Sequence, residues 1–138
     1  MIILDSDHAS VLKYRDSERY IRLTARLALA LEPVATTIVT AEEQMRGWLA
    51  SIAKERKAFR QVKPYLELRE LFNFFGGLSL LPFDEVSANL FEQFHRIRIG
   101  AMDRKIAAIT IANDSLLLTA NRSDFEQVPG LRFENWMD

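Results

Sequence analysis

The stretch Met1-Ile2-Ile3-Leu4-Asp5-Ser6-Asp7 decides how the chain can fold, because an apolar run is followed at once by acids. Three consecutive aliphatic residues, Ile2 to Leu4, are typical of a short strand that is buried on both faces of a parallel sheet. Asp5 stands where this strand ends. In an open α/β sheet, ligands bind beyond the carboxyl ends of the strands. The opening residues therefore predict a functional site at that edge.

Three further acids are predicted to lie at the same kind of position. Glu43 follows the β-branched run 36–40, Asp103 stands just ahead of an apolar helix pattern, and Asp124 follows the run Leu116-Leu117-Leu118-Thr119. Gathered at one edge, four carboxylates repel one another unless a cation balances them. Mg²⁺ prefers carboxylate and water oxygens. The acids therefore predict a metal-dependent active site, most simply one for phosphodiester chemistry.

Composition limits the classes of protein that need to be considered. The 138 residues, 49% of them hydrophobic, predict one domain over 1–138 with a substantial core. A net charge of −1 excludes a general polyanion binder, so a nucleic-acid partner would need a local basic surface. The absence of cysteine excludes disulfides and thiolate chemistry. With no signal segment or membrane span in the sequence, we expect a cytoplasmic protein without membrane contact.

Strand and helix patterns alternate along the chain. The predicted strands are 2–4, 36–40, 78–81, 116–119 and 131–133. The predicted helices are one that begins at Ser6, then 17–31, 41–57, Pro64 to Phe75, 85–96 and 103–113. This alternation favours an α/β fold in which a central parallel β-sheet is flanked by helices on both faces.

Each acid also has a purely structural interpretation. Asp5 can cap the following helix, and Asp7 can add a second acid or only cap, with the cap favoured. Glu42 and Glu43 point in different directions around a helix, so only one of them is expected to face the sheet. Asp103 can be a simple helix-start acid, and Asp124 an exposed turn residue. The shared relation of the acids to strand ends therefore carries more weight than any one of them.

Taken together, the segments around these acids resemble the motifs of the PIN-domain ribonucleases, specifically the VapC-like toxins of bacterial toxin–antitoxin pairs. In order along the chain they are Ile3-Leu4-Asp5-Ser6-Asp7, Thr40-Ala41-Glu42-Glu43-Gln44-Met45-Arg46-Gly47, Ile99-Gly100-Ala101-Met102-Asp103 with Ile106-Ala107-Ala108, and Leu118-Thr119-Ala120-Asn121-Arg122-Ser123-Asp124-Phe125. The second motif places a Glu four positions before a Gly, which selects Glu43 over Glu42. The ending, Val128 to Leu131 with Glu134-Asn135-Trp136, is also similar.

The resemblance implies a PIN-like fold that holds Mg²⁺ or Mn²⁺ for attack by water on RNA. It implies that Asp5, Glu43 and Asp103 form the core of the catalytic and metal-binding set, with Asp124 as a further member. It also implies a VapB-like antitoxin partner and a homodimer. The sequence departs from the family where Ser6-Asp7 replaces the commoner Thr-Asn and where residues 54–76 form a long helical region. Neither departure removes a core acid.

Substrate binding would depend on local bases, because phosphate contacts position a nucleic acid. Arg98 and Arg104 flank the third motif and are the better candidates, while the basic run 54–60 is interpreted as solvated helix charge. Ser6 and Asn121 are predicted to hydrogen-bond a metal-bound water or a phosphate.

The sequence leaves two possible roles for His8 and for a group of aromatic residues. His8 lies near Asp5 and can touch substrate, but a capping or surface position is the favoured interpretation. Four aromatic residues of the helical patterns can form either a partner-binding surface or part of the core. They are Trp48, Phe72, Phe74 and Phe75.

Three alternatives to an RNA nuclease are weighed. A catalytically silent PIN-like interaction module would need a degraded acid set, and this set is intact. A phosphoacceptor receiver domain would need a lysine at a late strand end, and 116–119 ends without one. A DNA-directed nuclease shares the metal chemistry and stays open.

Overall fold

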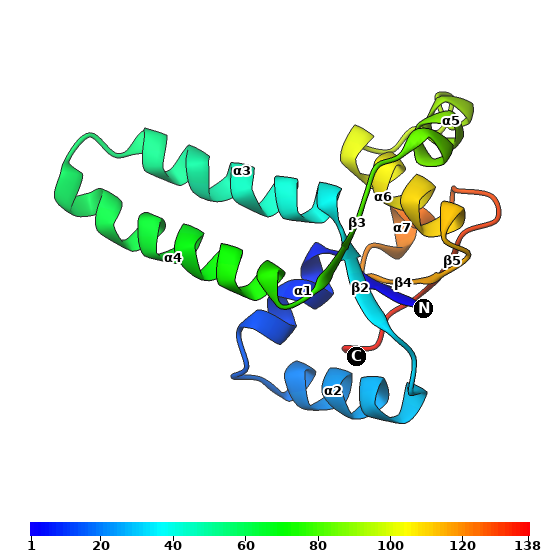
Figure 1. The fold of residues 1–138 in the computed structure, drawn as a ribbon, viewed down its shortest axis with the longest axis horizontal. Helices are drawn as coiled ribbons and strands as arrows, with labels where there is room; N and C mark the ends of the chain where they lie inside the picture. Colours follow the sequence, from blue (N-terminus) through cyan, green and yellow to red (C-terminus); the bar gives the residue numbers. More distant parts are fainter.

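A computed structural model describes residues 1–138 and places five parallel strands in one sheet with the order β3-β2-β1-β4-β5 (Figure 1). The strands are β1 (Ile2–Leu4), β2 (Val34–Thr37), β3 (Ser79–Leu81), β4 (Leu116–Leu118) and β5 (Arg132–Glu134). The helices are α1 (Ser6–Lys13), α2 (Glu18–Ala30), α3 (Ile38–Lys54), α4 (Ala58–Gly76), α5 (Glu85–Gln93), α6 (Ala101–Ala112) and α7 (Arg122–Phe125). The predicted α/β class is confirmed.

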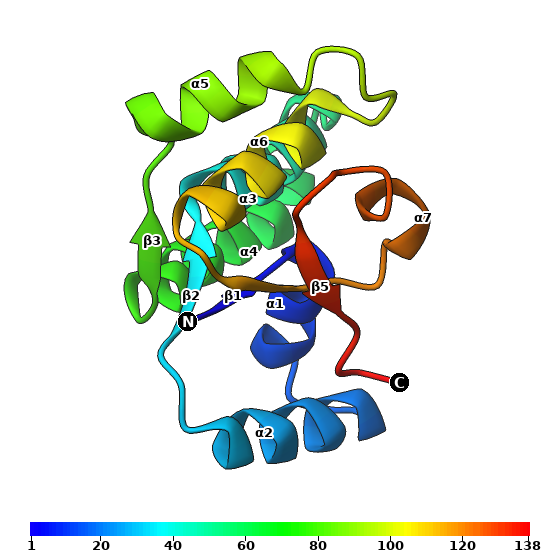
Figure 2. The ribbon, with the colours of Figure 1, turned by 90° about the vertical axis from the view of Figure 1, so that its right-hand side faces the viewer.

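Helices cover both faces of the sheet, as predicted (Figure 2). Successive residues of a strand point to opposite faces, so β1 serves two cores. Ile3 packs with Ile106 and Ile109 of α6, whereas Ile2 and Leu4 pack with residues of α1 and α2. All three β1 side chains are fully buried, which explains the continuous aliphatic run at the start of the chain.

The strand order creates the edge at which the site lies. The chain adds β2 and β3 on one side of β1 and then crosses to the other side for β4 and β5. The gap between the carboxyl ends of β1 and β4 is therefore a topological switch point, where open α/β sheets bind ligands. Asp5 follows β1 at this point and Thr119 follows β4.

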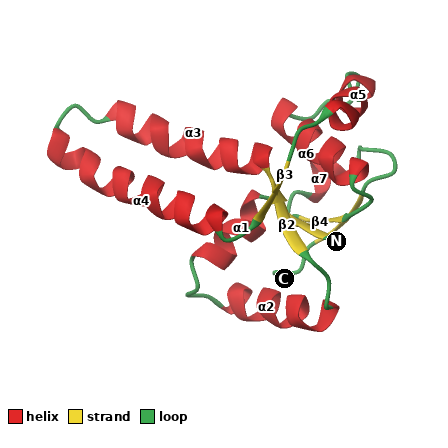
Figure 3. Cartoon of the chain, viewed as in Figure 1, coloured by secondary structure: helices red, strands yellow, loops and turns green.

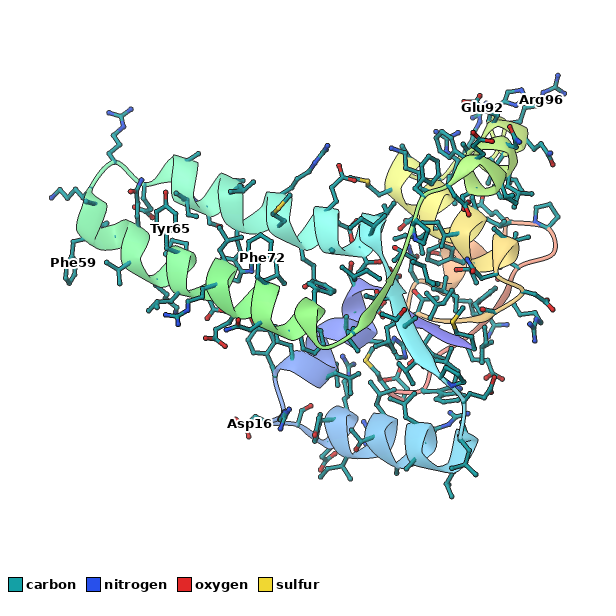
Figure 4. The ribbon with its side chains drawn as sticks, in the orientation of Figure 1. Asp16, Phe59, Tyr65, Phe72, Glu92 and Arg96 are labelled. Atoms are coloured by element: carbon teal, nitrogen blue, oxygen red, sulfur yellow. The ribbon has the colours of Figure 1, made fainter.

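Helices α3 and α4 form a hairpin, here called the arm, that extends away from the sheet (Figure 1, Figure 3). The basic residues of the 54–60 run are exposed at its far turn, far from the carboxyl edge of the sheet. This agrees with their interpretation as solvated charge. Figure 4 shows Phe59 at the tip of the arm, where 88% of its surface is exposed.

Two predicted boundaries are wrong in the region of the arm. The strand predicted over 36–40 ends at Thr37, because the Thr37 hydroxyl accepts a hydrogen bond from the Thr40 N–H at 2.9 Å and starts α3 there. Helix α4 begins at Ala58 and not at Pro64, which lies inside it. The Gln61 amide donates to the Ile52 and Glu55 carbonyls and so fixes the start of α4 against the end of α3.

Other differences concern the later acids. No strand precedes Asp103, which lies in the first turn of α6. Asp124 lies in the one-turn helix α7 and not in a loop. None of the helices is long and apolar enough to span a bilayer.

Candidate active site

Asp5 caps α1 and is held in place by two hydrogen bonds. Its carboxylate accepts from the Ser6 N–H at 2.8 Å and from the Thr119 hydroxyl at 2.7 Å, so it joins the ends of β1 and β4. Only 7% of its surface is exposed. Burial and the negative charge of Asp7 together raise the pKa of Asp5 to about 7, although both hydrogen bonds oppose this shift. Asp5 is thus both the cap and a perturbed acid of the site.

Glu43 reaches the same edge from the second turn of α3. Its carboxylate accepts a hydrogen bond from the Ser6 hydroxyl at 2.5 Å. Its neighbour Glu42 instead pairs with Arg46 at 2.6 Å on the side of the helix. Glu43 therefore lies on the side of α3 that faces Ser6, and Glu42 lies beside a base, as helix geometry requires of adjacent residues. Ser6, predicted to bind water or phosphate, uses its hydroxyl proton to orient Glu43.

Asp103 and Asp124 are brought together by Asn121. The Asn121 amide donates to Asp124 at 3.0 Å and approaches Asp103 at 3.4 Å. Helix α6 runs antiparallel to the strands, so its first turn lies at their carboxyl edge. Burial, the charges of Glu43 and Asp124, and a hydrogen bond with Asp124 raise the pKa of Asp103 to about 6. Asn121, predicted to bind water or phosphate, joins two acids here.

Asp7 and His8 have roles that the sequence interpretation missed. Asp7 is not a cap, because its carboxylate accepts from the Ala120 N–H at 2.9 Å and from His8 Nδ1 at 2.6 Å. Burial favours a higher pKa for Asp7, but these hydrogen bonds outweigh it and the pKa of Asp7 is lowered. His8 is fully buried and is not at the surface. No local signal distinguishes such a histidine, since the Trp136 N–H that binds its Nε2 comes from the other end of the chain.

We call Asp5, Glu43, Asp103 and Asp124 the acid site. All four side chains offer a cation only carboxylate oxygens, the ligand type that Mg²⁺ prefers. They influence one another by charge, yet no three of them stand together as a ready-made group of metal ligands. Mg²⁺ usually takes one or two carboxylates and keeps several waters, so the residues present suit this ion.

The two arginine candidates differ in their surroundings. Arg98 is exposed in the segment before α6. The Arg104 guanidinium lies over the Phe91 ring at 4.9 Å, and its buried Nε has no hydrogen-bond partner. Arg104 is therefore partly a packing residue, whereas Arg98 is free to meet a substrate. Arg96 is exposed beyond α5, at the outer end of the molecule (Figure 4).

The aromatic residues of the arm divide between the two interpretations that the sequence left open. Phe75 is buried, Phe74 packs against the core beside α1 and α2, and Trp48 is half-buried. Phe72 has 59% of its surface exposed and lines an apolar groove of about 420 Å³ between α3, α4 and β3. The region therefore contributes both core and open surface.

The raised pKa values predict how metal-free stability depends on pH. Asp5 and Asp103 titrate near 7 and near 6 in the folded protein, against an ordinary value of 3.8. Their neutral forms favour folding, so this contribution is complete below about pH 4 and is lost as pH rises through 6 and 7. We expect the Tm in a chelator-containing buffer to fall between about pH 4 and pH 7.

The control for this measurement is Asp5→Asn, which has no carboxyl group to ionise at this position. Its Tm should fall less over the same pH range. An equal fall in both proteins would show that the buried charge of Asp5 does not cause the pH dependence.

Comparison with solved structures found chains of the same fold. A chain of VapBC2 from Rickettsia felis, solved bound to a DNA fragment from the promoter, matches with a TM-score of 0.74 and 21% identity over 99% of both chains. A chain of DNA-bound VapBC from Salmonella typhimurium matches with a TM-score of 0.75 and 22% identity over 98% of this chain and 97% of that one. VapBC-5 from Mycobacterium tuberculosis, a member of the VapBC family of toxin–antitoxin systems, has a TM-score of 0.55 and 22% identity over 99% and 97%.

These likenesses confirm the predicted PIN-like fold and the predicted similarity of that fold to VapC-like proteins. Their coverage shows that the fold extends over nearly the whole length of both chains. No model of a known protein family and no curated protein sequence matches the chain.

Proposed function

We propose that this protein is a Mg²⁺- or Mn²⁺-dependent endoribonuclease that acts in the cytoplasm as the toxin of a VapBC-type toxin–antitoxin pair. The observation that carries the proposal is that four acids, one at the N-cap of α1 and the others in α3, α6 and α7, lie near the switch point of the sheet and influence one another by charge. Two of these acids have raised pKa values, which is typical of functional sites. The fold of the VapBC chains supports the same class.

In this proposal the four acids would hold the cation, some of them through its bound waters, and neighbouring side chains orient them. Asp5 is fixed by Thr119, Glu43 by Ser6, and the pair Asp103 and Asp124 by Asn121. When bound, a divalent cation makes its water a better nucleophile and neutralises charge that develops on the phosphate. The exposed Arg98 is available to contact the RNA backbone.

We also propose a VapB-like antitoxin as partner and a homodimer as the working state. The solved structures of similar fold include VapBC2 and VapBC, both bound to DNA. The apolar groove beside the arm, with Phe72 exposed on its rim, offers surface that a partner chain can cover. Co-expression with the product of a neighbouring short reading frame, followed by size measurement of the purified complex, tests both points.

Divalent metal should stabilise the folded protein by mass action, because the acid site exists only in the native state. We expect Mg²⁺ or Mn²⁺ to raise the Tm of the wild type by several degrees, and far less in Asp103→Asn. Thermal denaturation at increasing metal concentration measures this difference. Equal shifts in the two proteins would place the metal elsewhere.

The activity itself is tested by incubating the purified protein with total cellular RNA, with and without Mn²⁺, and mapping the cut sites. We expect metal-dependent internal cleavage. A parallel reaction with single-stranded and duplex DNA of matched length distinguishes a DNA-directed nuclease. Absence of cleavage of either nucleic acid, by a protein that binds metal, would favour the silent interaction module.

A further inference from the structure

His8 joins α1 to the C-terminal residues, which lie far away in the sequence. Its imidazole is fully buried between α1 and the C-terminal residues. Nε2 accepts a hydrogen bond from the Trp136 N–H at 3.1 Å, and Nδ1 lies 2.6 Å from the Asp7 carboxylate. Because Nε2 accepts from a backbone amide, the ring proton must be on Nδ1, from which it is donated to Asp7. The tautomer of His8 is thus determined by its two partners.

Asp7 connects His8 to the loop Thr119–Asn121, here called the 119–121 loop. One oxygen of Asp7 accepts from His8 and the other accepts from the Ala120 N–H at 2.9 Å. The Thr119 hydroxyl has one proton, which it donates to Asp5 at 2.7 Å and not to Asp7 at 3.4 Å. The hold of Asp7 on the loop is therefore through the Ala120 amide.

The 119–121 loop carries two of the side chains that orient the acid site. Thr119 binds Asp5, and the Asn121 amide joins Asp124 and Asp103. The Asn121 N–H also donates to the Thr119 hydroxyl at 3.0 Å, which couples the two side chains. A displacement of the Ala120 amide would therefore disturb three of the four acids.

The C-terminal segment that binds His8 Nε2 is itself held in place. Trp136 and Met137 are buried, the Arg26 guanidinium lies 4.6 Å from the centre of the Trp136 ring, and Arg22 Nε donates to the Met137 carbonyl at 2.7 Å. A mobile C-terminal segment would give His8 no fixed orientation. Here the segment is tied to α2, so the imidazole has a rigid support.

We propose that His8 is a positioning residue of the acid site, which acts by holding Asp7 so that Asp7 holds the 119–121 loop. The role rests on the proposed nuclease function for its chemical consequence, but the physical connection can be measured without activity. Outer hydrogen-bond partners of metal-binding carboxylates typically change metal affinity or activity by about 10- to 100-fold when removed.

Two substitutions separate the two hydrogen bonds of His8. Asparagine places an amide N–H near the position of Nδ1, so His8→Asn keeps a donor for Asp7 and loses the acceptor for the Trp136 N–H. Glutamine places an oxygen near the position of Nε2, so His8→Gln keeps the acceptor and loses the donor. Because a buried backbone amide without a partner is more harmful than a half-exposed carboxylate that water can reach, His8→Asn should have the lower Tm.

The test compares Tm, RNA cleavage, Mn²⁺ affinity and the amide NMR spectrum in wild type, His8→Asn and His8→Gln. We expect His8→Gln to lose about 10-fold or more in Mn²⁺ affinity and in cleavage rate. His8→Asn should stay within a few-fold of the wild type in both. The more active variant should therefore be the one with the lower Tm. The Ala120 and Asn121 amide resonances should move in His8→Gln and much less in His8→Asn. His95→Gln, at an exposed position, serves as the matched control and assigns the ring resonances.

The outcomes distinguish this inference from the proposed function. Unmoved Ala120 and Asn121 amides in His8→Gln, or a ring proton found on Nε2 in the wild type, would overturn the positioning role whether or not RNA is cut. Activity that falls in parallel with Tm in both variants would reduce His8 to a structural residue. A wild type that cuts no RNA, while the amides and Mn²⁺ affinity change as expected, would instead refute the nuclease.

Discussion

Replacing Asp5 with asparagine is expected to reduce metal-dependent RNA cleavage by about 10³-fold, because the substitution removes the carboxylate that lies at the switch point of the sheet. Asp5 lies at the switch point between β1 and β4 and is in contact with both ends through Ser6 and Thr119. Asparagine has the same shape, and its oxygen can still cap α1. The measurement is single-turnover cleavage of an RNA that contains a mapped cut site, at saturating Mn²⁺.

The same variant should be more stable than the wild type without metal. At pH 8 the wild-type Asp5 is ionised although its pKa is about 7 and it is almost completely buried. Removing this charge should raise the Tm in a chelator-containing buffer by several degrees. The inactive variant is then demonstrably folded. Wild-type cleavage rates in such a folded protein would refute the acid site as the centre of the chemistry.

Glu43→Gln is expected to reduce cleavage by about 10²-fold, whereas Glu42→Gln should change it by no more than a few-fold. Adjacent residues of a helix point about 100° apart, so only one of the two glutamates can join acids from other elements. Glu43 accepts a hydrogen bond from Ser6 beside Asp5, and Glu42 pairs with Arg46 on the side of α3. Both variants are measured on one RNA at saturating Mg²⁺.

Glu42→Gln is the matched control for this comparison, because it makes the same chemical change one residue away. It breaks an ion pair at the surface, which contributes little to stability. A larger loss in Glu42→Gln than in Glu43→Gln would mean that the second motif is aligned one residue out of register. Ser6→Ala provides a separate check, since it removes the donor to Glu43 and should lower cleavage by a smaller factor than Glu43→Gln.

The local sequence was sufficient to predict the class of fold. Three consecutive aliphatic residues before Asp5 indicate a strand buried on both faces, and the structure buries all three completely. The alternation of apolar runs with helical patterns indicated the parallel sheet. Glu43 was separated from Glu42 by spacing and helix geometry, because both depend only on near neighbours. These inferences succeeded since their physical causes act within a few residues.

Boundaries that depend on particular side-chain hydrogen bonds were predicted less well. The β-branched run 36–40 favours a strand, but the Thr37 hydroxyl caps a helix at that point. A proline often marks the first turn of a helix, which favours a start at Pro64. In the structure α4 begins earlier, and the Gln61 amide binds carbonyls at the end of α3. In both cases a single hydrogen bond or pair of bonds outweighed a modest residue preference.

By itself the sequence determined the parallel α/β fold, the acids available to the site and the absence of thiolate chemistry, because these follow from residue type and local periodicity. Only the tertiary structure decided which polar residues touch the acids. Thr119 reaches Asp5, Asn121 joins Asp103 to Asp124, and His8 connects Asp7 to the backbone of Trp136. Burial and charge then raise two of the pKa values. The contacts of Thr119 with Asp5 and of His8 with Trp136 join residues more than a hundred positions apart, and their geometry is determined by the packing of the whole chain.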